Sequence, residues 1–258
     1  MKVTISIHKS VQENAAFYYE RAKHSRKKIE GAKKAYEATL EKIKNFEARE
    51  KPKEIKVERK KEWYERFRWY KSSEGKIVIG GRDATSNDII VKKYTEDDDL
   101  VFHTEMPGSP FVVIKAEKKE ITEQEINEAA EFCAANSKAW NQGLAASDVF
   151  YVKPNQLKQD HGLGKGSFNV DGPRKFLKGL VQQGIGLLEN GRVMGGPVEA
   201  VKKHCKHFFV IKQGSEKKSD IAKDLKYKLA KLANAEVSLD DVMQALPPGE
   251  GKIMKKAS

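Results

Sequence analysis

The sequence predicts a mixed α/β (α+β) fold, in which a mixed β-sheet with flanking helices follows a long N-terminal coiled-coil helix. Two observations support this fold class. Residues 10–49 contain no proline and a single glycine, and small or apolar residues recur through them at heptad spacing. After residue 71, short apolar runs alternate with Gly, Asp, Asn and Pro, which is typical of a compact domain without regular βαβ alternation. We therefore divide the chain into an arm, residues 1–71, and a domain, residues 72–258.

The arm is predicted to begin with a helix over about residues 10–49, roughly 60 Å long at 1.5 Å per residue. Its heptad seam steps by four and three residues from Val11 to Phe46. Several seam positions are Ala, Ser or Thr, so the helix needs a partner helix to be stable. A second helix, predicted over about residues 54–70 after Lys51-Pro52 interrupts the first, is too short to cover the seam. We expect either a homodimer through the seam or, preferably, a partner helix that belongs to a longer polypeptide.

The domain is predicted to contain short strands and helices in irregular order. The expected strands are at residues 77–79, 100–103, 111–114, 149–152, 167–170 and 208–211, and the expected helices are at 122–141, 197–206, 219–233 and from 238. Thr122 with Glu125 matches a capping box, and Asn190-Gly191 is a strong hairpin signal. Residues 88–94 are ambiguous, because their β-branched side chains favour a strand whereas the preceding Ser-Asn-Asp favours a helix start.

The positive charge of the chain is concentrated in the arm. The formal net charge is +12 at pH 7; residues 1–71 hold 21 Lys and Arg against 11 Asp and Glu, whereas the rest of the chain holds 28 against 26. A basic arm on a nearly neutral domain indicates a polyanionic partner, most simply nucleic acid. Arg21, Arg26, Lys27 and Lys28 lie in the densest basic cluster, and we predict that they contact phosphates. The alternative is that these charges only keep the helix solvated.

The composition argues against several classes of protein. The chain has no apolar run of about 18 residues and no signal-peptide pattern, so we expect no membrane span and a cytoplasmic location. Cys133 and Cys205 make no disulfide framework, which fits a reducing compartment. His204 and His207 flank Cys205, but a second ligand pair at zinc spacing is missing. We therefore predict neither a metal site nor a cofactor.

Two segments of the domain are candidates for a chemical role. The glycine-rich loop at residues 162–167 departs from a P-loop, because Lys165 precedes the last glycine and a strand is expected to follow. We expect Lys165, with Arg174 and Lys175 close by in the sequence, to contact a backbone phosphate instead. Residues 97–105 hold acidic residues and a histidine that could bind a cation or act as acid and base. No nucleophile accompanies them, and we predict no catalytic residue.

The stretch at residues 62–83 joins the arm to the domain and is rich in aromatic side chains. On a helix, Trp63, Phe67 and Tyr70 would lie along one stripe. Such a stripe can stack on unpaired RNA bases, but at helical spacing it more often seats a helix on its domain, which is the interpretation favoured here.

Together these segments resemble the NFACT-R domain of the RqcH/NEMF family, once called fibronectin-binding-protein-A-like. The segments that carry the resemblance are residues 63–75, 79–87, 101–109, 166–168 and 174–177, and residues 3–35 resemble the returning helix of the family's middle coiled coil. The family pattern favours a helix over residues 88–94. It also marks Arg82, Asp83 and His103 as expected contacts with RNA.

The resemblance implies a role in ribosome-associated quality control. Members of this family bind obstructed large ribosomal subunits that carry peptidyl-tRNA, recruit tRNA and direct template-free, alanine-type tailing of the stalled nascent chain. We therefore expect large-subunit rRNA and tRNA as partners, and no enzymatic activity of the chain itself. The chain resembles the C-terminal half of the family architecture, and we expect the family's N-terminal tRNA-handling domain and outgoing coiled-coil helix to lie outside it. The alternative is an RNA-processing or other metal-dependent enzyme that uses residues 97–105.

Overall fold

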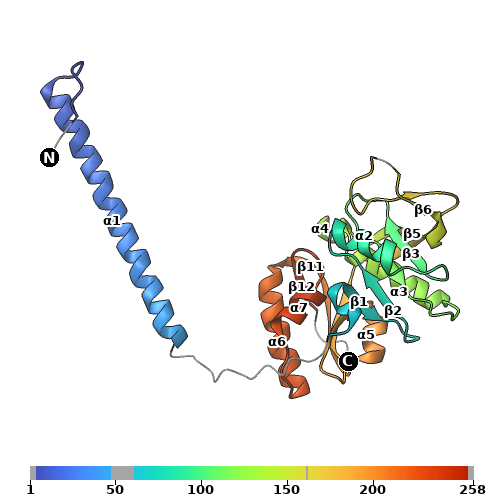
Figure 1. Cartoon of the computed structure of the whole chain (residues 1–258). Coiled ribbons are helices and arrows are strands. Elements are labelled where there is room, and N and C mark those ends of the chain that lie inside the picture. Colours follow the sequence, from blue (N-terminus) through green and yellow to red (C-terminus); the bar gives the residue numbers. More distant parts are fainter. Residues whose placement is uncertain (1–3, 48–60, 161, 255–258) are drawn as a thin grey trace. The chain divides into compact units, whose positions relative to one another are not determined.

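The computed structural model describes residues 4–47, 61–160 and 162–254, and it divides the chain into two compact units, Met1–Lys60 and Lys61–Ser258 (Figure 1). Each unit is described by itself. The first is dominated by one long helix, and the second combines helices with β-sheets. The α+β class predicted from the sequence is therefore confirmed.

The long helix of the arm, α1, spans Val11–Glu47 and contains 37 residues, as the heptad pattern predicted. It begins at a reciprocal cap, in which the Glu13 amide donates to Ser10 Oγ and the Ser10 amide donates to the Glu13 carboxylate at 2.7 Å. Seam residues such as Ile29 and Tyr36 are exposed within this unit. A partner helix that covers the seam stays a prediction.

The second helix predicted over residues 54–70 is wrong where the structure describes it, and its first part lies outside the described residues. Trp63–Arg66 forms one 3₁₀ turn, η1, and Arg68–Lys71 forms strand β1. The aromatic side chains explain the difference, because Phe67 is buried in one core of the domain and Tyr70 in the other. A strand directs side chains to both of its faces, whereas a helix would have kept both rings on one stripe. The folded domain therefore includes β1, upstream of the expected boundary at residue 72.

The domain is built on two antiparallel sheets and a short two-stranded ribbon. The first sheet has the order β1-β2-β4-β3-β5-β8, and the second has the order β10-β9-β11-β12. Besides β1, the strands of the first sheet are β2 (Ile77–Gly80), β3 (Leu100–Thr104), β4 (Val112–Ile114), β5 (Ala146–Val152) and β8 (Lys175–Leu180). Those of the second are β9 (Gln183–Leu187), β10 (Val193–Gly196), β11 (His207–Glu216) and β12 (Gly251–Ile253). The ribbon pairs β6 (Leu157–Lys158) with β7 (Asn169–Val170).

Every strand pair among the described residues is antiparallel. The mixed sheet expected from the sequence is therefore wrong in its strand directions, and the antiparallel pairing observed suits a chain without βαβ alternation. The hairpin signal at Asn190-Gly191 is confirmed, since these residues lie in the turn between β9 and β10 and Gly191 has a φ of +77°.

Helices cover the sheets. They are α2 (Ala84–Lys93), α3 (Glu123–Ala135), α4 (Lys138–Asn141), α5 (Val198–His204), α6 (Lys218–Ala233) and α7 (Leu239–Ala245), with a 3₁₀ turn, η2, at Pro154–Gln156. The ambiguous residues 88–94 belong mostly to α2, as the family pattern favoured. Thr122 caps α3 as predicted, but the helix expected to reach residue 141 is interrupted because Ser137 accepts a hydrogen bond from the Ala139 amide and starts α4.

The first sheet separates two hydrophobic cores. The larger core lies between α3, the strands of the first sheet that face it and the second sheet with α5, α6 and α7. The smaller core lies on the other face of the first sheet, where Ile90 of α2 meets Phe67, Phe111 and Phe150. This smaller core forms the support on which the cleft described below is built.

Among the described residues, no helix is both long enough and apolar enough to cross a membrane.

Candidate nucleic-acid interface

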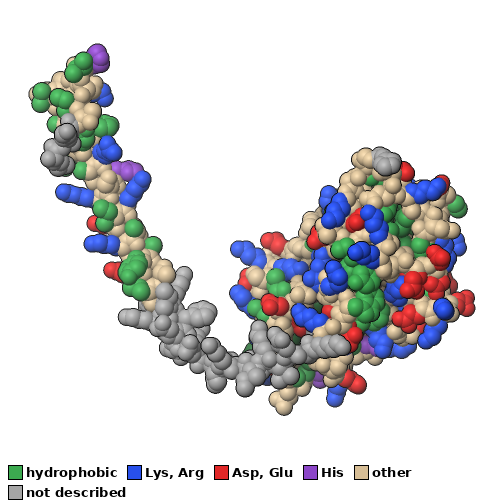
Figure 2. All heavy atoms as spheres, in the orientation of Figure 1, with side chains coloured by type: hydrophobic (Ala, Val, Ile, Leu, Met, Phe, Trp, Pro, Cys, Tyr) green, Lys and Arg blue, Asp and Glu red, His purple; other side chains and the backbone are tan. Residues whose placement is uncertain are grey.

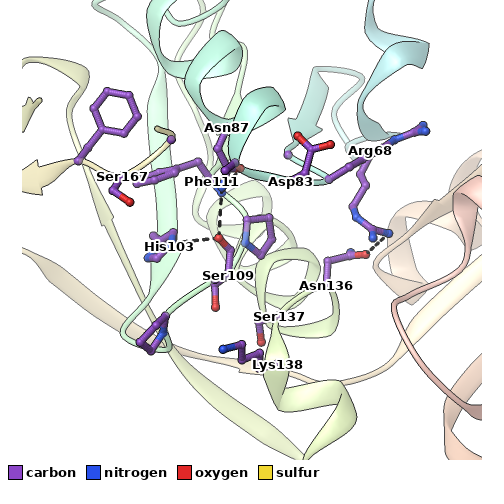
Figure 3. A pocket seen from close by; sticks show the side chains of 18 of the residues that line it. Arg68, Asp83, Asn87, His103, Ser109, Phe111, Asn136, Ser137, Lys138 and Ser167 are labelled. Atoms are coloured by element: carbon purple, nitrogen blue, oxygen red, sulfur yellow. Dashed lines mark hydrogen bonds between the residues drawn. The ribbon is translucent and has the colours of Figure 1, made fainter. Parts of the chain in front are cut away.

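A cleft of about 440 Å³ opens beside the smaller core, and segments far apart in the sequence line it. Figure 3 shows Arg68 and Asn136 on one side of this cleft and His103 and Ser167 on the other. The cleft also brings together residues that the sequence analysis predicted as RNA contacts, namely Arg82, Asp83, His103 and Lys165. A cavity of this size lies within the range of roughly 300–1,000 Å³ that is usual for ligand pockets.

The turn between β2 and α2 forms one wall of the cleft. Asp83 is the N-cap of α2, and its carboxylate accepts a hydrogen bond from the Ser86 amide at 2.7 Å. Hydrogen bonds from Ser86 hold the pKa of Asp83 below its usual value. Gly81 is required because a Cβ there would lie 1.8 Å from Oδ1 of the buried Asn87. Asp83 therefore shapes this wall, and its charge is already engaged by the helix start.

Two arginines lie at this end of the cleft. Arg82 donates from Nη2 to the Phe67 carbonyl and to Gln244 Oε1, each at 2.9 Å. Arg68 donates from Nη1 to Asn136 Oδ1 at 3.0 Å. Burial lowers the pKa of Arg82 and, together with the nearby charge of Arg82, lowers that of Arg68 to about 10. Both side chains stay cationic at neutral pH and are held in fixed orientations.

His103 contributes a flat ring to the opposite side of the cleft. Its Nε2 hydrogen-bonds to the Ser109 carbonyl at 3.1 Å, and its ring lies 4.4 Å from that of Phe111 between centroids. Burial lowers the pKa of His103, and Arg174 lowers it further. The imidazole is therefore neutral at pH 7 and offers an aromatic surface rather than a charge.

The glycine-rich loop closes the cleft from the same side. Gly166 has a φ of +74°, and a Cβ there would lie 2.1 Å from the Ala84 carbonyl oxygen, so the loop contacts the start of α2 backbone to backbone. This contact directs Lys165 and Phe168 to the cleft. The ring of Phe168 meets Phe111 edge to face at 5.5 Å. A lysine and an aromatic ring thus lie on the same loop, facing the cleft.

Arg174 and Lys175, adjacent in sequence, lie on different sides of the first sheet. The Arg174 guanidinium lies 4.8 Å from the ring centre of Phe150, which lines the cleft, and Arg174 also pairs with Glu105 at 3.5 Å. Lys175 lies over Tyr151 at 5.7 Å. Since Phe150 and Tyr151 are neighbours on β5 and point to opposite faces, Lys175 is directed away from the cleft. The structure therefore groups Arg174, but not Lys175, with the cleft residues.

The basic residues of the arm form a separate surface. Arg21, Arg26, Lys27 and Lys28 are all exposed on α1. Figure 2 shows basic side chains along the described part of the arm with few acidic ones, whereas both signs are spread over the visible face of the domain. This distribution is the one that the charge count predicts.

Sequence reasoning missed Arg68, Asn136 and Phe168 as cleft residues. Arg68 was assigned to a helix, and only its strand conformation brings its guanidinium to Asn136, 68 positions later. Asn136 ends α3, where its Nδ2 donates to the Phe132 carbonyl at 2.9 Å. Phe168 belongs to the Gly166-Ser167-Phe168 segment that resembles the NFACT-R domain, and that resemblance is the signal that could have identified it, whereas no sequence signal marks Arg68 or Asn136.

The acidic residues at 97–105 do not assemble a site with His103. Glu96, Asp98 and Asp99 approach one another at the start of β3, and the buried Asp99 pairs with Lys115 Nζ at 2.5 Å. His103 lies near the other end of β3, roughly 13 Å along an extended strand. Lys115 also lies 3.7 Å from Glu96, so an ammonium group already occupies the place where a cation would neutralise the cluster.

Comparison with known proteins gives one family match and several relatives. Residues 66–172 match the family described as NFACT protein RNA binding domain. Over 209 residues the chain is 35% identical to the archaeal Rqc2 homolog aRqcH of Methanocaldococcus jannaschii, covering 78% of this chain and 31% of that protein. It is 33% identical over 174 residues to the ribosome quality control complex subunit NEMF of Homo sapiens, covering 64% of this chain and 16% of that protein.

The matched residues 66–172 contain every cleft-lining residue named above. The chain spans about a third or less of the length of these two relatives. A solved structure, the C-terminal part of a fibronectin/fibrinogen-binding protein from Streptococcus suis, matches 51% of this chain and 50% of that chain at 21% identity, with a TM-score of 0.41. That structural similarity is too low to support an argument.

Proposed function

The chain belongs to the RqcH/NEMF family of ribosome quality control factors, over part of the family's length, and from this premise we propose that its domain binds unpaired RNA in the cleft. The observation that carries the proposal is the composition of the cleft. Cationic groups, Arg68, Arg82 and Lys165, stand beside aromatic rings that include Phe168 and His103. Single-stranded nucleic acid is bound by this combination of positive charge along the backbone and aromatic surfaces for the bases.

The shape of the cleft favours an unpaired strand over a duplex. A double helix presents its phosphates on a broad convex surface, whereas a concave site of this size admits an extruded nucleotide. The neutral ring of His103 adds an aromatic surface without adding charge. We therefore place base recognition on the side of His103 and Phe168 and phosphate binding on the side of the two arginines.

The wider role rests on the resemblance to the RqcH/NEMF family, one relative of which is named a ribosome quality control complex subunit. We propose that the chain binds the large ribosomal subunit and tRNA as part of ribosome quality control, and that it supports template-free, alanine-type tailing of stalled chains together with the rest of the family architecture. The basic residues of α1 would add a second, sequence-independent contact with RNA. A ribosome-bound role would take place in the cytoplasm.

The alternative, a metal-dependent enzyme acting through residues 97–105, has less support. Such an enzyme needs its acid, base and metal ligands in one place. Here His103 and the acidic cluster lie at opposite ends of β3, and Lys115 binds the acidic cluster. One of the relatives compared above, NEMF, is named as a subunit of the ribosome quality control complex. We therefore propose a binding function without catalysis.

The test uses two lysines of the domain as a matched pair. Lys165→Gln removes a charge from the cleft, and Lys175→Gln removes a charge from the other face of the sheet. Affinity for a labelled single-stranded oligouridylate is measured by fluorescence anisotropy across a salt series. We expect Lys165→Gln to lower the slope of log K against log salt by about 0.7, and Lys175→Gln to leave the slope unchanged.

A second variant tests the aromatic part of the site. Phe168→Leu keeps an apolar side chain but removes the ring, and we expect it to weaken binding by about 1–3 kcal/mol if a base stacks there. If neither Lys165→Gln nor Phe168→Leu changes the affinity while the wild-type domain binds RNA, the RNA surface lies elsewhere and the proposal is wrong.

A further inference from the structure

A group of three cations surrounds the C-terminal end of α7. The Leu246 carbonyl oxygen accepts hydrogen bonds from Arg68 Nη1 at 3.3 Å and from Lys218 Nζ at 3.0 Å, so these two charged groups lie next to each other. Arg82 is joined to the same region, because its Nη2 bonds to the Phe67 carbonyl and to Gln244 of α7. Strand β1, the turn before α2 and the first residue of α6 therefore converge on one point.

No carboxylate pairs with this group within the part of the chain that the structure describes. The ion pairs of the described residues include none for Arg68, Arg82 or Lys218. Asp83 is the acidic neighbour of Arg82, and its carboxylate already accepts hydrogen bonds from Ser86. Three positive charges are thus held together, with Arg68 and Lys218 partly buried and Arg82 exposed, and a bound anion would offset the free-energy cost of their mutual repulsion.

Burial and the neighbouring charges lower the pKa values of Lys218 and Arg68. Burial, followed by repulsion from Arg68 and Arg82, lowers the pKa of Lys218 to about 8. Burial and Arg82 lower the pKa of Arg68 to about 10. Proteins use clusters of this kind, with arginine donors fixed in orientation, to bind phosphate groups.

The guanidinium groups also keep donors available. The hydrogen bonds of the described residues engage Nη1 of Arg68 and Nη2 of Arg82, and an arginine has five N–H donors in all. Both arginines line the cleft, with Arg68 oriented by Asn136. Lys218 is not among the residues that line the cleft, but its Nζ lies at the Leu246 carbonyl next to Arg68 and adds to the positive potential at this end.

We propose that Arg68 and Arg82, supported by Lys218, form a phosphate site at one end of the cleft, and that it takes a backbone phosphate of unpaired RNA. The inference rests on the proposed function, because the nucleoside attached to this phosphate would lie along the cleft toward His103 and Phe168. Arg68 and Arg82 contact the phosphate, and Lys218 acts through them as a positioning residue. Free inorganic phosphate has the same chemistry, so the experiment has to distinguish the two sources.

The experiment measures the affinity of the full chain for the labelled oligouridylate between pH 7 and pH 9.5. Wild-type affinity is expected to fall as the pH rises through about 8, because Lys218 loses its proton there and the site loses a positive charge. Lys218→Gln keeps a donor for the Leu246 carbonyl but removes the charge, so it should bind several-fold more weakly at pH 7 and show no fall near pH 8. Lys231→Gln, at the far end of the same helix, is the matched control and should follow the wild type.

Arg68 is tested by charge-conserving and charge-removing variants. Arg68→Gln should lower the salt slope by about 0.7, and Arg68→Lys should restore most of it. Circular dichroism shows whether each variant is folded, and Lys218→Gln keeps the proposal testable if Arg68→Gln does not fold. In a parallel experiment, NMR follows the pKa of Lys218, which should rise when the oligouridylate binds.

The outcomes separate this inference from the proposed function. If Lys218→Gln binds like the wild type at every pH while Phe168→Leu and Lys165→Gln weaken binding, the phosphate site is wrong and RNA binding in the cleft stands. If inorganic phosphate raises the pKa of Lys218 but the oligouridylate does not, the site takes free phosphate and the assignment to RNA is overturned. If the oligouridylate raises that pKa, and inorganic phosphate competes with it, the inference is supported.

Discussion

Gly166→Ala tests whether the glycine-rich loop positions the aromatic side of the cleft. The added Cβ would lie 2.1 Å from the Ala84 carbonyl oxygen, whereas ordinary contacts begin at 3.4 Å. The oxygen belongs to the backbone at the start of α2, which is held by the Asp83 cap and cannot turn aside. The loop must therefore retreat by roughly 1 Å or more, and it carries Lys165 and Phe168 with it.

The size of the effect on binding follows from what the loop supplies. Stacking of a base on an aromatic side chain contributes about 1–3 kcal/mol, so displacement of Phe168 should weaken binding of unpaired RNA roughly 5- to 150-fold. The left-handed backbone at residue 166 adds a conformational cost of about 1–2 kcal/mol for alanine. Because the loop lies at the rim of the fold, we expect this cost to loosen the loop rather than unfold the domain.

Gly162→Ala is the matched control in the same loop. Gly162 also has a positive φ, +99°, but a Cβ there meets nothing within 4 Å. Both variants bear the same kind of backbone strain, and only Gly166→Ala adds the clash. Fluorescence anisotropy with the labelled oligouridylate should show weak binding for Gly166→Ala and near wild-type binding for Gly162→Ala. Equal affinities for both variants and the wild type would refute the role given to the loop.

Three further predictions address the arm and the stability of the domain. Lys76→Met should lower the free energy of unfolding by about 3–5 kcal/mol in urea titrations, because it leaves the fully buried Glu125 carboxylate without its partner at 2.7 Å; a loss below about 1 kcal/mol would contradict this account. Burial and the nearby Glu128 and Glu199 raise the pKa of Glu131 to about 7. Between pH 4.5 and about 7 the folded state therefore binds more protons than the unfolded state, and the free energy of unfolding should fall as the pH rises through this range. Glu131→Gln should remove that dependence in melting experiments at several pH values, and an unchanged profile would exclude Glu131 as its source. Replacing the three basic residues at 26–28 by Gln should lower the salt slope for large ribosomal subunits by roughly 2–3, and an unchanged slope would mean that these charges only solvate the helix.

The elements with strong local signals were predictable from the sequence. The heptad pattern identified α1, the Thr122 cap identified the start of α3, and Asn190-Gly191 identified the hairpin of the second sheet. Each of these signals depends on residues within a few positions of one another. Tertiary contacts add little to them, which is why they could be recognised in a single sequence.

The strand β1 shows where local patterns fail. Trp63, Phe67 and Tyr70 have helical spacing, yet Arg68–Lys71 pairs with Ile77–Gly80 and buries its rings on both sides of the sheet. The strand conformation is stabilised by burial in cores that distant segments assemble, and a short window of sequence does not contain those segments.

The residues of the cleft could be predicted only in part, again because distant segments assemble it. Arg82, His103 and Lys165 were expected to contact RNA, and the structure brings them together. Lys175 was grouped with them because it is close in sequence, but the alternation of β8 and β5 turns it to the other face. Arg68 and Lys218 are 150 positions apart in the sequence, yet both donate to the Leu246 carbonyl oxygen. No spacing in the sequence indicates that they lie together.

The most direct test of the central claim is to locate RNA on the domain by photo-crosslinking. Single-stranded RNA containing 4-thiouridine is irradiated with the full chain, and the cross-linked residues are identified by mass spectrometry. If unpaired RNA enters the cleft, the cross-links will fall on Phe168, His103 and their immediate neighbours. Cross-links confined to the arm or to the face of the sheet that carries Lys175 would contradict the assignment.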